Sequence, residues 1–359
     1  MKFLTRAAAL LLICSTLFLA CACASEDEGN GSESWSGAAS DTLLQSETTT
    51  EKPTTKPTNK ATTSTTNATE KEVVDPYADE ILDALQKAAS GTTVYSVAVS
   101  TEKGIKVRAI KNDKAQNTYS VSKVFCVTAI GMLYDEGKIK TSDTIGEIFK
   151  DELKQYGITD GRWDNITVHD VLKHNVGFKK ENLLDVDADP GLMTKHNDFL
   201  KVTLSYELDG KKTNRYTDAA YYLISRVVSK ISGQKLDVYL KSRLFDKAGF
   251  KDYTIKTCPQ GYPLGATQFF LRPNDMVKLG RIYLNYGTYE GKRIFSKEWA
   301  EIVINKGYEL NKSGTGYAKG GMNGQYLYIN YKHNVAAAWL SKYDDNTWKL
   351  GDTLKEYMK

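Results

Sequence analysis

The spacing of apolar residues along the chain changes from strand-like to helix-like and back again. Alternating apolar positions predict two hairpins, with strands at residues 94–99, 105–110, 326–329 and 335–340. Between the hairpins, apolar stripes at helical spacing predict helices over residues 121–134, 168–173, 219–231, 236–245 and 276–284. Two further helices are predicted at the edges, one beginning at Asp75-Pro76 and one over residues 348–358.

Strands at both ends with helices between them predict an α+β fold, that is, a mixed α/β protein. We expect the two hairpins to join into one antiparallel sheet, with the helical segment inserted beside it as a lobe. A cleft between the sheet and the lobe is then expected. Small ligands usually bind in such a crevice.

The first 24 residues read as a secretory signal peptide. Lys2 and Arg6 precede an unbroken apolar run over residues 7–24. A retained membrane anchor is the alternative, although the run is short for a helix that crosses a bilayer. Cys21 lies where a bacterial lipoprotein carries its acylated cysteine, whereas cleavage after Ala24 would release the protein.

The next segment, residues 25–75, is rich in Thr, Ser and Glu and has almost no aliphatic pattern. Such a segment cannot bury a core, so we expect a disordered linker. Residues 76–359 are expected to form the folded domain. The chain is thus predicted to be exported, and to stay at the extracellular face of the membrane or in the cell wall through a lipid anchor, or else to be secreted.

Charge and short motifs exclude several classes of function. The chain has 48 Lys and Arg against 44 Asp and Glu, and no basic cluster with interleaved aromatic residues, so no nucleic-acid partner is expected. No metal-ligand spacing, phosphate loop or dinucleotide fingerprint is present, so neither a metal nor another cofactor is expected. Of five cysteines, only Cys126 and Cys258 lie in the body, where a disulfide and two buried thiols both remain open.

A candidate nucleophile lies at the start of the predicted helix 121–134. In Ser120-Val121-Ser122-Lys123 the hydroxyl and the amine are three residues apart and share one helix face. A lysine that is partly desolvated can lose its proton and then accept one from the serine. Ser100-Thr101-Glu102-Lys103 repeats the spacing, but there the serine ends a strand and the lysine lies in a turn. A plain N-cap serine is the alternative interpretation of Ser120.

Further segments, in the same order, resemble the class C β-lactamase and penicillin-binding family of serine hydrolases from about residue 94 to residue 341. Ser120-Val121-Ser122-Lys123 resembles the first motif, Tyr216-Thr217-Asp218 the Tyr-x-Asn motif, and Lys319-Gly320-Gly321 the Lys/His-x-Gly strand. Residues 136–139 and 166–178 resemble a helix ending and the structural Leu-Leu-x-His-x-Ser-Gly-Leu stretch. Residues 283–285 and 328–330 also spell Tyr-x-Asn, without that context. The resemblance implies the β-lactamase/transpeptidase-like fold.

The resemblance also implies roles for individual residues. Ser120 would attack the substrate, and Lys123 and Tyr216 would share the proton transfers. Lys319 would supply positive charge for a substrate carboxylate. The backbone amides of Ser120 and Met322 would form the oxyanion hole, which stabilises developing negative charge.

Asp218 departs from the family pattern, which has asparagine there. An ionised aspartate accepts hydrogen bonds but donates none. It would hold Lys123 by charge and keep it protonated, so that Tyr216 would have to serve as the base. Asp218 also cannot donate to a substrate carbonyl, which argues against efficient penicillin or peptide turnover. We assign Asp218 and Gly321, with Lys319, to the substrate-binding part of the site.

The sequence therefore predicts an exported serine hydrolase that forms an acyl-enzyme on Ser120 with a β-lactam, a D-alanyl peptide from peptidoglycan or a small ester. A Ser-His-Asp triad is disfavoured because there is no Gly-x-Ser-x-Gly motif and only four histidines. His169 and His174 are expected to be structural residues near the helix start at Thr167. The alternative is a catalytically weak or inactive penicillin-binding-like module at the cell wall.

Overall fold

The computed structural model describes residues 74–343 and 346–359. The predicted signal peptide, the lipidation site Cys21 and almost all of the predicted linker lie outside these residues. Among the described residues, no helix has the length and apolar character needed to cross a membrane.

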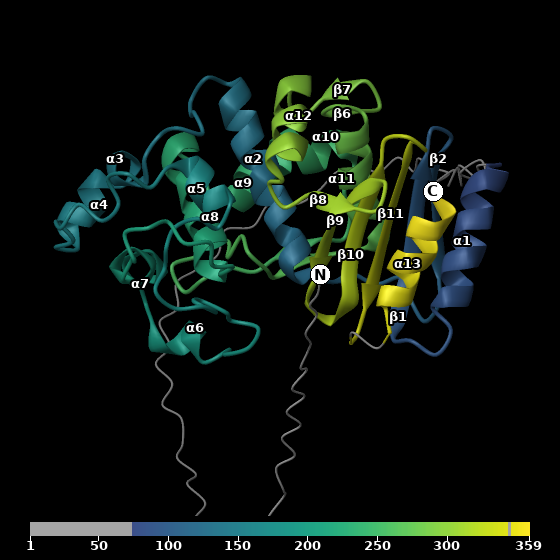
Figure 1. Ribbon diagram of the computed structural model, residues 1–359, viewed down its shortest axis with the longest axis horizontal. Coiled ribbons are helices and arrows are strands. Elements are labelled where there is room, and N and C mark those ends of the chain that lie inside the picture. The colour runs from purple at the N-terminus through teal and green to yellow at the C-terminus, as the bar shows by residue number, and fades with distance from the viewer. Residues whose placement is uncertain (1–73, 344–345) are drawn as a thin grey trace, which may run out of the picture. The chain divides into compact units, whose positions relative to one another are not determined.

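A six-stranded antiparallel sheet joins the two ends of the described chain, in the order β2-β1-β11-β10-β9-β8 (Figure 1). The strands are β1 (Val94–Thr101), β2 (Gly104–Ala109), β8 (Asn311–Ser313), β9 (Gly316–Gly321), β10 (Gln325–Asn330) and β11 (Val335–Ser341). The two predicted hairpins meet where β1 pairs with β11, with Val99 opposite Ala337. The predicted α+β architecture is confirmed.

Helices cover both faces of this sheet. The helix α1 (Pro76–Ala88) packs with α13 (Trp348–Tyr357) on one face, and α11 (Pro273–Leu284) packs on β1, β10 and β11 from the other. Side chains alternate along a strand, so Val97 and Val99 belong to the core under α1 and α13, whereas Ala98 belongs to the larger core of the helical lobe. The predicted start of α1 is confirmed, because the Asp75 side chain accepts a hydrogen bond from the Ala78 amide.

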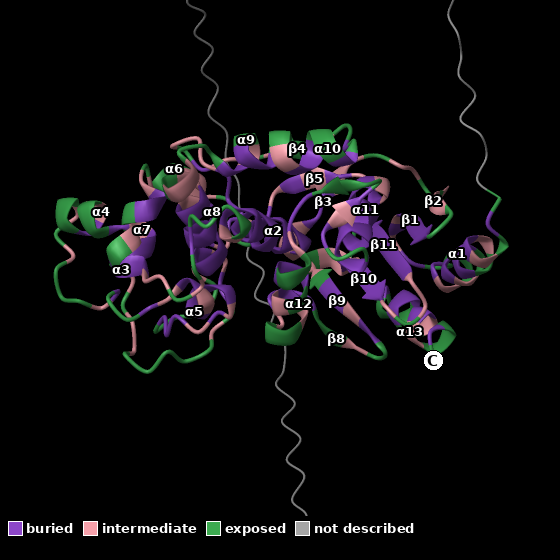
Figure 2. Ribbon diagram, turned by 90° about the horizontal axis from the view of Figure 1, so that it is seen from above, coloured by how far each residue is buried: buried purple, intermediate pink, exposed green. Residues whose placement is uncertain are grey.

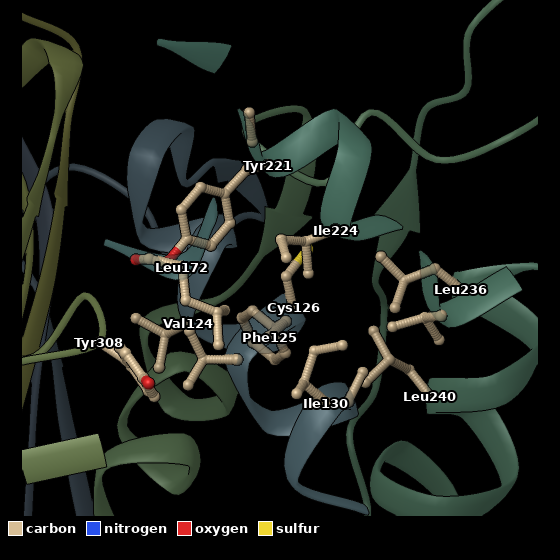
Figure 3. Packing of buried hydrophobic residues seen from close by; sticks show 14 of the residues in the cluster. Val124, Phe125, Cys126, Ile130, Leu172, Tyr221, Ile224, Leu236, Leu240 and Tyr308 are labelled. Atoms are coloured by element: carbon tan, nitrogen blue, oxygen red, sulfur yellow. The ribbon is translucent and has the colours of Figure 1, made fainter. Parts of the chain in front are cut away.

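The helical lobe is built around α2 (Ser122–Asp135), which is buried from Ser122 to Leu133 (Figure 2). Because α2 is apolar on all sides, it is surrounded by other elements instead of lying at the surface. Its neighbours include α8 (Asp218–Ser232) and α9 (Leu236–Leu240), and α5 (Val168–Leu172) packs against α8. Phe125 and Ile130 of α2 belong to one buried cluster with Ile224 of α8 and with Leu236 and Leu240 of α9, all labelled in Figure 3.

The remaining elements are short. The other helices are α3 (Ile145–Ile148), α4 (Lys150–Gln155), α6 (Leu192–Lys195), α7 (Phe199–Ser205), α10 (Asp246–Ala248) and α12 (Lys297–Lys306). The small strands are β3 (Gln116–Asn117), β4 (Thr254–Ile255), β5 (Phe269–Leu271), β6 (Thr288–Tyr289) and β7 (Lys292–Arg293). Strands of two or three residues are too short to show an alternating pattern, which is why the sequence did not predict them.

The five predicted lobe helices are all present, with one change of geometry. The predicted helix 236–245 is α9 followed by a π-helical turn, Lys241–Phe245. The alternative left open for the two body cysteines is also settled, because Cys126 and Cys258 are both buried and free.

Candidate active site

Ser120 lies in a single 3-10 turn, Tyr119–Val121, which leads directly into α2. Tyr119 has a φ of 46°, a conformation that bulky residues rarely adopt. Its amide is held by the side chain of Asn117 at 3.0 Å. In the first turn of α2, the fully buried Lys123 donates from Nζ to Ser120 Oγ at 3.1 Å. The three-residue spacing thus brings the two groups into contact.

Lys123 is surrounded by acceptors. Its Nζ also donates to Asp218 Oδ1 at 2.7 Å and to the carbonyl oxygen of Ala266 at 3.0 Å. Burial by itself would lower the pKa of Lys123, but the negative charge of Asp218, helped by nearby acidic groups, outweighs burial and raises this pKa. The charge of Asp218 thus argues against Lys123 as a base that burial makes neutral, and that role of Lys123 stays a prediction. Asp218 instead holds it as an ammonium, as its charge led us to expect.

Tyr216 and Lys319 reach the same place, the first from the loop just before α8 and the second from β9. Tyr216 stands just before Thr217, the N-cap of α8, and its side chain is 46% exposed. Lys319 is buried in β9 and donates from Nζ to Tyr216 Oη at 3.1 Å. The ammonium groups of Lys123 and Lys319 each lie 4.8 Å from the centre of the Tyr216 ring. Tyr216 therefore lies between two lysines.

Glu309 is a residue of this site that the sequence did not reveal. It is 3% exposed and forms an ion pair with Lys319. Burial would raise its pKa, but Lys319 and a hydrogen bond from His174 outweigh burial and hold the pKa of Glu309 well below its usual range. Glu309 is thus ionised and offsets the charge of Lys319. It follows the end of α12 at no periodic position, so no sequence signal marks it.

His174, expected to be structural, connects this pair to Tyr216. The Thr217 amide donates to His174 Nδ1 at 3.4 Å, so Nε2 carries the proton and donates to Glu309 Oε1 at 2.8 Å. Burial lowers the pKa of His174, which keeps the ring neutral. The ring also packs against that of Tyr216, with centroids 4.4 Å apart. His169 lies elsewhere, with Nδ1 2.5 Å from Tyr308 Oη.

Gly321 lets β9 pass close to Ser120. A Cβ atom at this position would lie 2.7 Å from the carbonyl oxygen of Thr118 and 3.2 Å from the amide nitrogen of Ser120. No side chain fits between these segments without movement of the backbone. Met322 follows immediately, so the two amides assigned to the oxyanion hole belong to neighbouring segments.

These residues open into one cavity of about 280 Å³. Besides Ser120, Tyr216, Asp218 and Met322, it is lined by Tyr119, Asn182, Asp185, Asp187 and Thr217. The segment that contributes Asn182, Asp185 and Asp187 has no regular structure, and the sequence did not single it out. Carboxylate oxygens of Asp185, Asp187 and Asp218 lie within 4.8 Å of one another. They are the one set among the described residues with the spacing of metal ligands; that no metal is needed stays a prediction.

Comparison with known proteins places this geometry in context. A family model described as Beta-lactamase matches residues 83–353. A 6-aminohexanoate-dimer hydrolase of Paenarthrobacter ureafaciens is 23% identical over 224 residues, which are 58% of this chain and 55% of the relative. The chain thus spans about half the length of that curated relative.

Solved structures show the same fold at low sequence identity. A family VIII carboxylesterase superposes with a TM-score of 0.63 at 15% identity, covering 79% of this chain and 98% of the esterase. A D-amino acid amidase of Ochrobactrum anthropi superposes with a TM-score of 0.57 at 15% identity, covering 77% and 99% of the two chains. At such low sequence identity the structural similarity establishes the fold alone. The chemistry must be inferred from the residues of the site.

Proposed function

Because this chain belongs to the beta-lactamase family, we propose that it is a serine hydrolase that cleaves an amide or an ester through an acyl-enzyme on Ser120. The observation that carries the proposal is the 3.1 Å hydrogen bond from Lys123 to Ser120 Oγ at the wall of a cavity that Tyr216 also lines. A nucleophile and its activating groups in contact at one pocket are the arrangement that covalent catalysis requires.

The state of Lys123 determines how the proton moves in this proposal. As an ammonium, Lys123 donates a hydrogen bond that stabilises the oxygen of Ser120 as it loses its proton. Tyr216 is then the remaining acceptor, and Lys319 stabilises its oxygen when that oxygen carries negative charge. Tyr216 enters the step as a phenolate that Lys319 stabilises. Ser120 Oγ bonds to the substrate carbonyl carbon while its proton passes to Tyr216, and the resulting phenol gives this proton to the leaving group as the bond between the carbonyl carbon and the leaving group breaks. Water attacks the acyl-enzyme by the same route in reverse.

The proposed substrate is a small amide or ester. The cavity of about 280 Å³ is small, and Asp218 has no hydrogen to donate to a substrate carbonyl. The relatives are named as hydrolases of a 6-aminohexanoate dimer, of carboxylic esters and of D-amino acid amides, which supports both bond types. A D-alanyl peptide released from peptidoglycan falls within this class.

Labelling of the protein with two reagents, followed by intact-mass measurement, tests the proposal. A fluorophosphonate and a fluorescent penicillin are each applied to the wild type and to Ser120→Ala. An adduct with the fluorophosphonate that disappears in Ser120→Ala is expected. The absence of a serine-dependent adduct with either reagent would overturn the enzyme assignment.

The alternative is a penicillin-binding module with little or no turnover. The contact between Asp218 and the protonated Lys123 favours it, because a lysine in that state cannot act as a base. A penicillin adduct on Ser120 that forms but does not turn over, together with no hydrolysis of small esters or amides, is the result that this alternative predicts.

Export is a separate part of the proposal. The charged start and apolar run of residues 1–24 support secretion, and Cys21 supports a lipid anchor at the extracellular face of the membrane. Expression in a bacterial host with radiolabelled palmitate is expected to label the wild type and not Cys21→Ala. Label in both proteins would refute the anchor at Cys21.

A further inference from the structure

The cavity beside Ser120 has more negative charge than the catalytic groups require. Asp185, Asp187 and Asp218 all line it. Asp218 has a cationic partner, the buried ammonium of Lys123. Among the described residues, no lysine, arginine or histidine nitrogen lies within 4.0 Å of the carboxylate of Asp185 or of Asp187, so these two charges face the cavity without a counter-ion.

The Asp187 carboxylate is hydrogen-bonded, although no cationic group in the described part of the chain pairs with it. Neutral donors surround its carboxylate: the Thr267 hydroxyl, the Gln268 amide and, at 3.3 Å, the Asn117 amide. Burial raises the pKa of Asp187, and the negative charges of Asp218 and Asp185 raise it further, against the opposing effect of these hydrogen bonds. A positively charged group between Asp185 and Asp187 would relieve this repulsion.

The positive charge expected to attract a substrate carboxylate is already neutralised. Lys319 was assigned that role from the family resemblance, but it is buried and paired with the ionised Glu309. The site therefore has two positively charged lysines and four carboxylates, and His174 is neutral. The lysines are Lys123 and Lys319, and the carboxylates are those of Asp185, Asp187, Asp218 and Glu309. The excess is negative, which disfavours an anionic substrate and favours a cationic one.

We propose that the substrate cleaved at Ser120 carries a positively charged amino group near the scissile bond, and that Asp185 and Asp187 bind this group. The inference rests on the proposed function, since it concerns the same pocket. Asp218 contacts Lys123, Lys123 contacts Ser120, and the three carboxylates lie within 4.8 Å of one another. An ammonium group bound by these carboxylates would lie close to Ser120. The substrate would therefore carry its amino group only a short chain away from the carbonyl that Ser120 attacks.

Protection of Ser120 from the fluorophosphonate provides the test. Alaninamide and N-acetylalaninamide differ at the amino group, which is protonated at pH 6.5 only in the first. Alaninamide is expected to protect Ser120 at an about 10-fold lower concentration, since hydrogen bonds to charged groups are worth at least that factor. The corresponding 4-nitroanilides and methyl esters are expected to show the same preference in kcat/KM.

Variants identify the residues responsible. Asp185→Asn is expected to remove most of the preference for the free amine, and Asp187→Asn serves as a second variant. Asp189→Asn is the matched control, because Asp189 lies on the same segment but is exposed, is paired with Lys195 at 2.9 Å and does not line the cavity. The control is expected to keep the full preference. Melting temperatures of all three variants show whether each one folds.

The outcomes separate this inference from the proposed function. If Ser120 is not labelled at all, the proposed function is wrong and this inference falls with it. If Ser120 is labelled but both amides protect equally, or if Asp185→Asn and Asp187→Asn keep the preference, this inference alone is overturned. It is also overturned if CaCl₂ raises the melting temperature in an Asp185-dependent manner while the two amides protect equally, because the carboxylates would then bind a metal ion.

Discussion

Replacement of Asp218 by asparagine would remove the negative charge 2.7 Å from Lys123 Nζ and keep an oxygen in nearly the same place. At that distance, and at an effective dielectric constant of about 20, the attraction between the two charges is about 6 kcal/mol. The net loss is smaller, because the amide oxygen still accepts a hydrogen bond and Lys123 can release its proton. We expect the free energy of unfolding at pH 6.5 to fall by about 2–4 kcal/mol.

The loss is expected to depend on pH, with a sign that follows from proton linkage. In the wild type the pKa of Lys123 is raised, so this lysine stays protonated at neutral pH and its contribution is lost only as the pH rises through the raised value. In Asp218→Asn, burial acts without the opposing charge and would lower the pKa of Lys123. The unfolded variant then binds more protons than the folded one, so its stability rises with pH. The difference from the wild type should therefore shrink between pH 6.5 and pH 9.5.

Urea denaturation of both proteins across this pH range measures the effect. Asp275→Asn is a matched control, since it breaks another buried pair, with Lys278 at 2.8 Å, away from Ser120. Both substitutions should destabilise the protein. Asp218→Asn alone should change the catalytic behaviour, with acylation by a fluorescent penicillin faster on the order of 10-fold, because a neutral Lys123 can act as a base. A loss of stability in Asp218→Asn that does not vary with pH would refute the reasoning that Asp218 sets the charge of Lys123.

Three other predictions follow from single contacts. Glu309→Gln leaves Lys319 buried without a counter-charge and should lower the free energy of unfolding by about 3–5 kcal/mol in urea denaturation; a loss below about 1 kcal/mol would contradict the ion pair. Gly321→Ala should lower kcat by about 10- to 100-fold, because the added Cβ meets the Thr118 carbonyl and the Ser120 amide. Gly320→Ala is the control and should have a much smaller effect, since its Cβ would have no neighbour closer than 3.8 Å. Equal losses of kcat in the two variants would argue against the close approach at Gly321. Cys126 should resist Ellman's reagent in the folded protein, because burial raises the pKa of its thiol, and should react in denaturant, as peptide mapping would show; rapid native modification would be inconsistent with its burial.

Features that depend on neighbours in the chain were predictable from the sequence. The short apolar runs of β1 and β11, which are bounded by turns, and the longer apolar run of α2 each predict their own element, since run length and flanking turns are local features of the chain. The contact between Ser120 and Lys123 spans a single helical turn and is equally local. The contact with Asp218, 95 residues away, was anticipated only because an ordered set of motifs resembled a known family.

Only the tertiary structure decided which charges are compensated and which are not. His174 and Glu309 are 135 residues apart, and no periodicity connects them. Asp185 and Asp187 lie on an irregular segment that becomes part of the cavity only when the lobe folds against the Ser120 turn. Protonation depends on burial and on the sum of nearby charges, and both are properties of the packed protein. The sequence by itself therefore determined the elements and pointed to Ser120, while folding determined that Lys123 pairs with Asp218, that Lys319 pairs with Glu309 and that three aspartates line the pocket.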